Sequence, residues 1–330
     1  MVKKEVLHWY IGSTCNAIPR CNYCFEHDFP FNRPTSEMDA KSNSPENIRR
    51  VAEKVSSLGL QRVILGGGEP MIAKGVWDAM EILGQSCPVE VHTNALSFYR
   101  SKEKLEKLKD LADTVVIPID SYDPSIQHQL RSYDTIDVFF QAFNGLSTNK
   151  RTDIGIHTVA TAVNLKSIPD LYERLKDQGF DYWKIYEFNM VLAAHQLLNP
   201  NMLNTPLGQN KYIEAHARLR KLAGLPREFR RGKMMRSAQF AESVLELERQ
   251  VGTWEDPRMS VVLLDDHPES YLFLHNSGDV FGYFPTLPDD MGDRELLGNI
   301  FSNNMNEIIH ARDSHSVLEK DERIRALIEA

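Results

Sequence analysis

The chain has 330 residues, of which 42% are hydrophobic and 25% are charged, an ordinary composition for a globular protein. It holds 46 acidic and 38 basic residues, and this net charge of −8 argues against a general nucleic-acid-binding role, which favours a basic balance. No apolar run is long enough to span a bilayer, and the first ten residues show no apolar stretch or small-residue cleavage site, so we predict neither a membrane span nor a signal peptide.

Short apolar segments alternate with charged, helix-like segments over the first 190 residues. The predicted strands, rich in Val, Ile and aromatic residues, cover 6–11, 62–65, 89–92, 114–119, 154–160 and 182–188. The predicted helices cover 44–58, 75–83, 102–111, 136–146 and 168–178, and Ser44 is placed as a helix N-cap. This alternation predicts an α/β fold with a parallel sheet, and six such units predict a partial (β/α)6 barrel of the TIM type. In such barrels the chemistry lies at the carboxyl ends of the strands.

The pattern changes after about residue 190. A helix is predicted over 211–222, a hairpin from strands 271–274 and 280–284, and a last helix over 305–317. We therefore divide the chain into a barrel, residues 1–190, and a C-terminal extension, residues 191–330, which we expect to cap the barrel and complete a substrate pocket.

Three of the four cysteines, Cys15, Cys21 and Cys24, follow the first predicted strand with the spacing C-x5-C-x2-C. In a reducing cytoplasm, where we place this chain, such a cluster indicates a metal site before a disulfide. Three thiolates can hold three irons of a [4Fe–4S] cubane and leave the fourth iron open to a ligand. A Cys3His zinc site with His27 and a set of unligated buried thiols are the alternatives that the cysteines alone leave open.

The second predicted strand ends in the run Gly66-Gly67-Gly68-Glu69-Pro70. Glycines at this point let the backbone approach a ligand closely, and Glu69 can accept a hydrogen bond from an ammonium group. Alone, such a glycine run is weak evidence for a ligand site, because it is often just a tight strand-to-helix turn.

The cysteine loop followed, one β–α unit later, by Gly-Gly-Glu-Pro resembles the radical S-adenosylmethionine (SAM) superfamily. The resemblance covers roughly residues 5–190, and it implies a [4Fe–4S] cluster and SAM as cofactors. It departs from the common C-x3-C-x2-C spacing by two extra residues in the first interval, so the loop must bulge.

Site residues follow from this resemblance by position. Cys15, Cys21 and Cys24 would hold the cluster, and the Gly-Gly-Glu segment would hold the methionyl amino group. The remaining SAM contacts implied are aromatic residues beside the adenine, residues at the ribose and an Arg whose planar fork suits the methionyl carboxylate. The full SAM-binding set is Tyr23, Phe25, Gly67, Gly68, Glu69, Asn94, Ser121, Arg131 and Thr158, with His157 as an alternative to Thr158.

The fifth and sixth predicted strands look like those of viperin-like enzymes, which remove water from a nucleoside triphosphate. Lys184 matches a phosphate-binding lysine of that branch and Arg62 a basic position, whereas Tyr182 stands where a further basic residue is expected. Tyr186 is a candidate hydrogen donor. A basic run over 218–236, which includes Arg230 and Arg231, could attract a phosphorylated substrate or be a solvated helix face.

No cysteine follows Cys87, so a second cluster held by cysteines alone is excluded from this sequence. Cys87 precedes the third predicted strand, at the wrong end of a barrel for chemistry, and we expect a buried structural thiol.

We therefore predict a cytoplasmic radical SAM enzyme that abstracts hydrogen from a small polar substrate, a nucleotide or a sugar-like metabolite, for dehydration, oxidation or rearrangement. A flavodoxin or ferredoxin would supply the electron, and neither a membrane nor a nucleic acid is an expected partner. A peptide or an aminocyclitol is the alternative substrate, and a Cys3His zinc-binding module is the alternative of another class.

Overall fold

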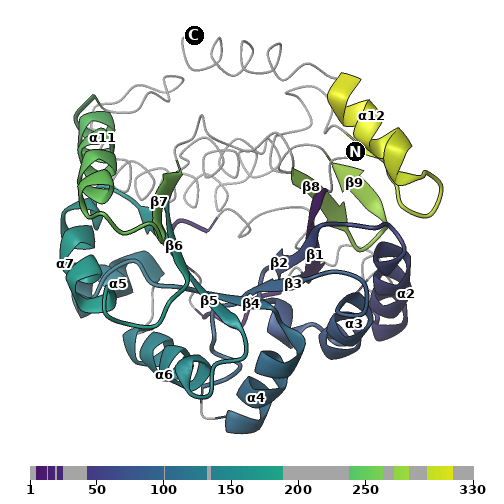
Figure 1. Ribbon diagram of the computed structural model, residues 1–330, viewed down its shortest axis with the longest axis horizontal. Coiled ribbons are helices and arrows are strands. Elements are labelled where there is room, and N and C mark those ends of the chain that lie inside the picture. Colours follow the sequence, from purple (N-terminus) through teal and green to yellow (C-terminus); the bar gives the residue numbers. More distant parts are fainter. Residues whose placement is uncertain are drawn as a thin grey trace, which may run out of the picture.

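The computed structural model describes residues 5–12, 14–18, 21–24, 43–99, 101–131, 135–188, 238–262, 271–281 and 296–314. Six parallel strands form the centre of its sheet: β1 (Val6–Gly12), β2 (Arg62–Gly67), β3 (Val89–His92), β4 (Thr114–Pro118), β5 (Asp153–Ala160) and β6 (Tyr182–Glu187). The connecting helices include α2 (Pro45–Ser56), α3 (Val76–Leu83), α4 (Lys102–Leu111), α6 (Ile136–Ser147) and α7 (Ile168–Leu175), which lie on the outer side of the curved sheet (Figure 1). The predicted partial TIM-type barrel is confirmed.

The described part of the C-terminal half extends the same sheet at both edges. β7 (Met259–Val262) pairs in parallel with β6, and β8 (Tyr271–His275) pairs in parallel with β1. β9 (Asp279–Phe281) and β10 (Leu296–Asn299) continue the sheet antiparallel beyond β8. Helix α11 (Ala238–Thr253) contacts β7, and helix α12 (Met305–Ser314) contacts β10. The predicted hairpin is therefore present. The predicted helix over 211–222 lies outside the described residues. The division of the chain at residue 190 stays a prediction.

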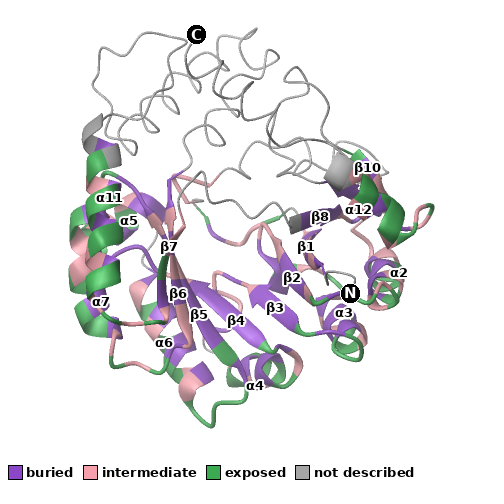
Figure 2. Ribbon diagram, turned by 45° about the horizontal axis from the view of Figure 1, so that its top comes forward, coloured by how far each residue is buried: buried purple, intermediate pink, exposed green. Residues whose placement is uncertain are grey.

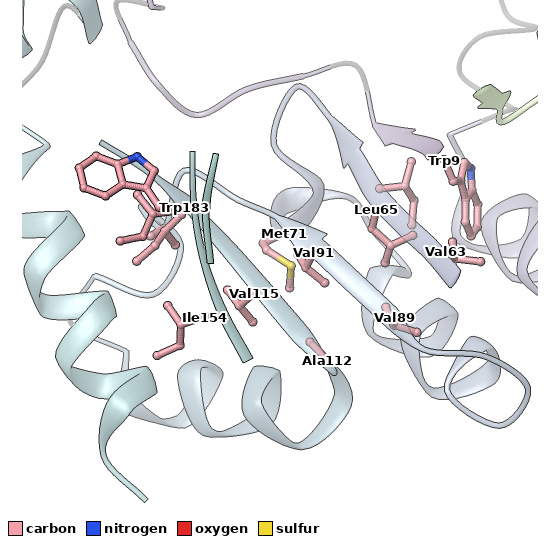
Figure 3. Packing of buried hydrophobic residues seen from close by; sticks show 14 of the residues in the cluster. Trp9, Val63, Leu65, Met71, Val89, Val91, Ala112, Val115, Ile154 and Trp183 are labelled. Atoms are coloured by element: carbon pink, nitrogen blue, oxygen red, sulfur yellow. The ribbon is translucent and has the colours of Figure 1, made fainter. Parts of the chain in front are cut away.

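Side-chain alternation along the strands separates an apolar outer face from a polar lumen. On β1, Leu7, Trp9 and Ile11 are fully buried under the helices, whereas His8 and Tyr10 face inward and are partly exposed. Figure 2 shows that most residues of the central strands are buried, whereas the surrounding helices carry many exposed residues. Figure 3 shows buried apolar residues distributed along the sheet, from Trp9 at one side of the view to Trp183 at the other. Burying each large side chain here contributes about 1.5–3 kcal/mol to stability, which fixes the register of the strands.

Helix boundaries follow local signals where these are strong. Ser44 accepts a hydrogen bond from the backbone N–H of Asn47 and so caps α2, as predicted. Helix α5 (Pro124–Arg131) was not predicted, because its eight residues carry a short apolar pattern. Its Gln127 accepts from the backbone N–H groups of Asp120 and Ser121, which fixes the helix against the end of β4.

The absence of a side chain at Gly155 makes room for the Tyr182 ring inside the barrel. A Cβ atom at Gly155 would lie 2.4 Å from Tyr182 Cζ, and the Tyr182 hydroxyl donates to Glu90 Oε1 across the lumen at 3.1 Å. The ring therefore fills the floor of the barrel at its amino-terminal end.

We expect Gly155→Ala to lower the free energy of unfolding by about 1–3 kcal/mol, because the new methyl group overpacks the lumen against a ring held by a hydrogen bond. Chemical denaturation measures this. Gly179→Ala is the matched control, since a Cβ there meets nothing within 4 Å, and its effect should stay within about 0.5 kcal/mol. Equal stabilities of the two variants would contradict this account of the floor.

Candidate active site

The carboxyl ends of four neighbouring strands bring the predicted site residues together. The cysteine loop follows β1, the Gly-Gly-Glu segment follows β2, Asn94 follows β3 and Ser121 follows β4. Two backbone hydrogen bonds join the first two loops: Gly68 N–H donates to the Gly12 carbonyl and Glu69 N–H donates to the Thr14 carbonyl, both at 2.8 Å. The base of the cysteine loop is thereby continuous with the sheet.

Gly67 occupies a position that only glycine fits. Its φ angle is +116°, and a Cβ atom there would lie 2.2 Å from the Gly12 carbonyl oxygen. That carbonyl is the acceptor for Gly68 N–H, so a side chain at residue 67 would separate the cysteine loop from the second strand. The neighbouring Gly66 has open space at its Cβ position.

We expect Gly67→Ala to lower the free energy of unfolding by at least about 2 kcal/mol, through backbone strain and the clash with Gly12. Gly66→Ala, one residue away, should change it by less than about 0.5 kcal/mol. Thermal and chemical denaturation of both variants provide the comparison, and a Gly67→Ala protein as stable as Gly66→Ala would contradict the close approach.

Glu69 is a buried carboxylate, 1% exposed, at the centre of the site. It accepts hydrogen bonds from Thr93 Oγ1 at 2.6 Å, from Asn94 N–H at 2.7 Å and from Met71 N–H at 3.1 Å. Burial raises the pKa of Glu69 to about 7, and the three donated hydrogen bonds oppose that rise. A cation bound beside Glu69 would offset the burial and lower its pKa, so the carboxylate suits an ammonium ligand.

The raised pKa makes stability depend on pH. Between its ordinary value of 4.5 and about 7, folded Glu69 holds a proton that the unfolded chain has lost, so its contribution to stability falls as pH rises through this window. We expect the free energy of unfolding of the parent, minus that of Glu69→Gln, to fall by roughly 2–3 kcal/mol between pH 5 and pH 8. Urea titrations across this range test it, and a difference that is constant or rises with pH would contradict the buried carboxyl.

Asn94 joins Glu69 to the cysteine loop. Its backbone N–H donates to Glu69, while its side-chain amide donates to Asn16 Oδ1 at 2.8 Å and to Cys15 Sγ at 3.5 Å. The Ala17 N–H also donates to Cys15 Sγ, at 3.4 Å. The sequence assigned Asn94 to the ribose of SAM, and the structure places its amide at a cysteine sulfur.

The buried Asp120 is a site residue that the sequence analysis missed. It is fully buried and accepts from the Tyr23 hydroxyl at 2.6 Å, from the Val159 N–H at 2.9 Å and pairs with Arg131 Nε at 2.8 Å. Arg131 Nη1 in turn lies 3.8 Å from Cys21 Sγ. The available signal was an acidic residue directly after an apolar strand, at the carboxyl end where charged groups meet ligands.

A small gap, too narrow to admit a water molecule, lies between the ends of β3 and β4 and helices α5 and α6. It brings together two residues assigned to SAM from distant parts of the sequence, Asn94 and Arg131. The full lining is Asn94, Ala95, Ile117, Pro118, Arg131, Thr135 and Phe139. Because Ile117 and Phe139 belong to the buried core, this gap is part of the packing between the sheet and α6.

Two other residues assigned to SAM have structural partners. Ser121 is fully buried, shares a hydrogen bond with Ser167 and accepts from the Asp123 N–H. Thr158 is also fully buried; it donates to the Ile119 carbonyl and accepts from the Trp183 indole at 2.9 Å. Thr158 thus lies on the outer face of β5, and the structure gives it a packing role in place of the predicted contact with adenosine.

The lumen of the barrel is lined by imidazole, phenol and ammonium groups. His157 faces inward, with its ring centroid 4.8 Å from that of His92 and 4.9 Å from that of Tyr186, and Lys184 Nζ lies 5.4 Å from the Tyr182 ring centroid. Burial holds the pKa of His157 well below its usual range, and its Nε2 atom is buried without a hydrogen-bond partner among the described residues. A neutral imidazole with an unused nitrogen is a candidate substrate contact.

Arg62, predicted to bind phosphate, lies at the other end of the barrel. It begins β2, whereas the cysteine loop lies at the carboxyl ends, and its guanidinium pairs with Glu90 at 2.6 Å. Its position at the amino-terminal end of the barrel, away from the cysteine loop, argues against the predicted contact between Arg62 and a substrate phosphate. Cys87 is buried at the same end, before β3, as expected of a structural thiol.

Several predicted residues lie outside the described part of the chain: Phe25, His27, Arg230 and Arg231. Within the described part, no three His, Cys, Asp or Glu side chains surround a position for a single metal ion. Thiolates on one zinc ion lie within about 4 Å of one another, whereas the irons of a cubane hold them farther apart. The Cys3His alternative depends on His27 and stays untested by this geometry.

Comparison with known proteins supplies the family. Residues 9–149 match the model of the radical SAM superfamily. These residues are a radical SAM domain. The family uses a [4Fe–4S] cluster and SAM, as the cysteine loop predicted.

Sequence relatives include a probable GTP 3′,8-cyclase of Methanocaldococcus jannaschii, 22% identical over 172 residues, which are 51% of this chain and 54% of that protein. A GTP 3′,8-cyclase of Aeromonas hydrophila is 29% identical over 124 residues, 36% of this chain and 35% of that one. The chain thus spans about half or less of the length of these relatives.

Solved structures show the same fold over most of the chain. Streptococcus suis SuiB bound to SAM has a TM-score of 0.60 at 12% identity, covering 93% of this chain and 65% of that one. Native anSMEcpe with bound AdoMet has a TM-score of 0.60 at 14% identity, covering 94% of this chain and 82% of that one.

The residues present fit the cluster and SAM. Cys15 and Cys21 each receive N–H groups at their sulfurs, and Cys24 lies on the same loop. Burial raises the pKa of the Cys21 thiol, so a metal bound there would supply the positive charge that keeps it a thiolate. Glu69, buried beside them, offers a carboxylate for an ammonium group.

Proposed function

We propose that this chain is a radical SAM enzyme that acts on a small polar substrate, a nucleotide or a sugar-like metabolite, bound in the lumen of the barrel. Three thiolates, those of Cys15, Cys21 and Cys24, would hold the cluster, and Glu69 would hold the methionyl amino group. When bound and reduced, the cluster supplies the electron that cleaves SAM to a 5′-deoxyadenosyl radical able to abstract a substrate hydrogen. A flavodoxin or ferredoxin is the proposed donor of that electron.

The polar lumen carries the substrate part of this proposal. His157, Lys184 and Tyr186 lie on the inner faces of β5 and β6. A lumen that only packed apolar side chains would favour Val, Ile and Leu at these positions. The Nε2 atom of His157, which has no hydrogen-bond partner in the part of the chain that the structure describes, supports a ligand with a hydrogen-bonding group, and the Lys184 ammonium supports an anionic one.

The residues of the site would orient the reactants and exclude water. The Glu69 carboxylate and the Arg131 guanidinium offer opposite charges to the two ends of a zwitterionic methionyl group. Tyr186 lies next to His157 and offers a phenolic hydrogen near the proposed substrate. Since no cysteine is available at this end of the described sheet beyond the cluster loop, reactions without a cysteine hydrogen donor, such as dehydration or rearrangement, suit the site best.

A nucleotide is favoured by the relatives, which are GTP 3′,8-cyclases. A peptide is the second candidate substrate. Two solved structures whose alignments cover 92% and 94% of this chain are SuiB bound to the precursor peptide SuiA and anSMEcpe bound to AdoMet and a peptide. The viperin-like features of β6 add support for a nucleotide only through Lys184. The described residues contain no helix long and apolar enough to cross a membrane, and we propose a cytoplasmic location.

The test is anaerobic reconstitution with iron and sulfide, followed by SAM and dithionite, with 5′-deoxyadenosine as the readout. We expect 5′-deoxyadenosine from the parent and none from Cys21→Ala, because the variant lacks one of the three cluster ligands. GTP and other nucleotides should accelerate its formation in the parent and be consumed with it. A short peptide library is the parallel arm.

The outcomes separate the hypotheses. Acceleration by peptides and not by nucleotides would replace the nucleotide proposal with the peptide one. A parent that binds zinc and forms no cluster would remove the enzyme proposal and favour the Cys3His module. To localise the substrate, His157→Phe and Lys184→Met should raise KM for the accelerating nucleotide at least about tenfold, whereas Arg62→Gln should leave KM unchanged.

A further inference from the structure

Three N–H donors point at the sulfurs of the cysteine loop, and one of them is charged. The Ala17 backbone and the Asn94 amide donate to Cys15 Sγ, at 3.4 Å and 3.5 Å. The Arg131 guanidinium donates to Cys21 Sγ from 3.8 Å. Arg131 is 6% exposed, so its charge acts in a place that water screens weakly.

Asp120 fixes the guanidinium in this position. Its carboxylate pairs with Arg131 Nε at 2.8 Å and is itself held by the Tyr23 hydroxyl and the Val159 backbone N–H. The Arg131 Cζ atom lies 5.5 Å from the Tyr23 ring centroid, so the ring of the cysteine loop covers the cation. Asp120 has no exposed surface, and a buried carboxylate cannot release its cation to water without a large cost.

The cysteine loop is tied to the same helix by its backbone. Asn22 N–H donates to the Leu130 carbonyl at 2.7 Å, and the Asn22 amide donates to the Gln129 carbonyl at 2.6 Å. The cysteine loop and the end of helix α5 are therefore joined next to Arg131 by hydrogen bonds to the backbone.

We propose that Arg131, aimed by Asp120, raises the reduction potential of the cluster by donating a charge-assisted hydrogen bond to the Cys21 thiolate. The inference rests on the proposed function, since it needs the cluster. Both charges of the ion pair act on Cys21, and the effect of Arg131 is larger than the opposing effect of Asp120. One-electron reduction adds a negative charge to the cluster and its thiolates, so the larger effect of the Arg131 charge stabilises the reduced form more than the oxidised form. Hydrogen bonds to the sulfurs are among the factors that set iron–sulfur potentials.

The experiment is a potentiometric titration with dithionite of the reconstituted protein, without SAM, followed by electron paramagnetic resonance. The main variant is the double substitution Arg131→Gln/Asp120→Asn, which replaces the ion pair by two amides and leaves no buried charge unpaired. We expect a reduced-to-oxidised ratio about tenfold lower than that of the parent at a fixed potential, equivalent to a midpoint 59 mV more negative. Arg131→Lys keeps the ion pair with Asp120 and should shift the midpoint in the same direction by less, because an ammonium lacks the fork that reaches two partners.

Arg151→Gln is the matched control. Arg151 is 46% exposed, precedes β5 and pairs with Glu106 of α4. Its loss should change the reduced-to-oxidised ratio at a fixed potential by less than about twofold. Iron and sulfide content are measured for every protein.

Loaded Arg131 variants with the parent's midpoint would overturn the inference while leaving the proposed function intact. Loss of the cluster from both Arg131 variants, with the parent loaded, would show that Arg131 serves assembly and not potential, and would also overturn it. A parent that forms no cluster would overturn the inference and the proposed function together.

Discussion

The fold of the site depends on a carboxylate that has been removed from water. Asp120 has no exposed surface, so its charge must be matched by donors inside the protein. Those donors come from three different segments: the cysteine loop through Tyr23, helix α5 through Arg131 and β5 through Val159. The buried carboxylate of Glu69 likewise accepts hydrogen bonds from two segments: from Asn94 after β3 and from Met71 in the turn after β2. Two buried acids thus hold the loops that follow the parallel strands in one arrangement. Breaking these hydrogen bonds would leave a buried charge without donors, a cost that surface hydrogen bonds do not carry.

Much of the barrel follows from the sequence because the strand signals are strong. The predicted strands at 89–92 and 154–160 differ from β3 and β5 by at most one residue, and the predicted helix at 102–111 has the bounds of α4. Buried strands flanked by charged helices leave few other folds. The short α5 and the edge strands β7 and β10 were missed, because segments of four to eight residues carry too little periodicity to separate them from loops.

The site was less predictable where side-chain direction mattered. Thr158 and His157 are neighbours on β5, and a strand sends neighbours to opposite faces, so only one of them can face the lumen. Ile154 and Ile156 share the outer face of β5 with Thr158, but the polar Thr158 side chain does not mark that face as apolar in the sequence. The structure places His157 inside and Thr158 outside. The ion pair of Arg62 was also not predictable from the sequence. Its partner Glu90 is 28 residues away, and the two side chains meet only because β2 and β3 lie side by side.

The central claim is that three thiolates hold a [4Fe–4S] cluster whose fourth iron is free to bind SAM. The most direct measurement is the electron paramagnetic resonance spectrum of the reduced, reconstituted protein with and without SAM, together with its iron content. The account predicts about four irons per chain and a spectrum that changes when SAM is added, because the ligand occupies the open iron. One zinc ion per chain with no iron–sulfur signal, or a loaded cluster whose spectrum is indifferent to SAM, would contradict it.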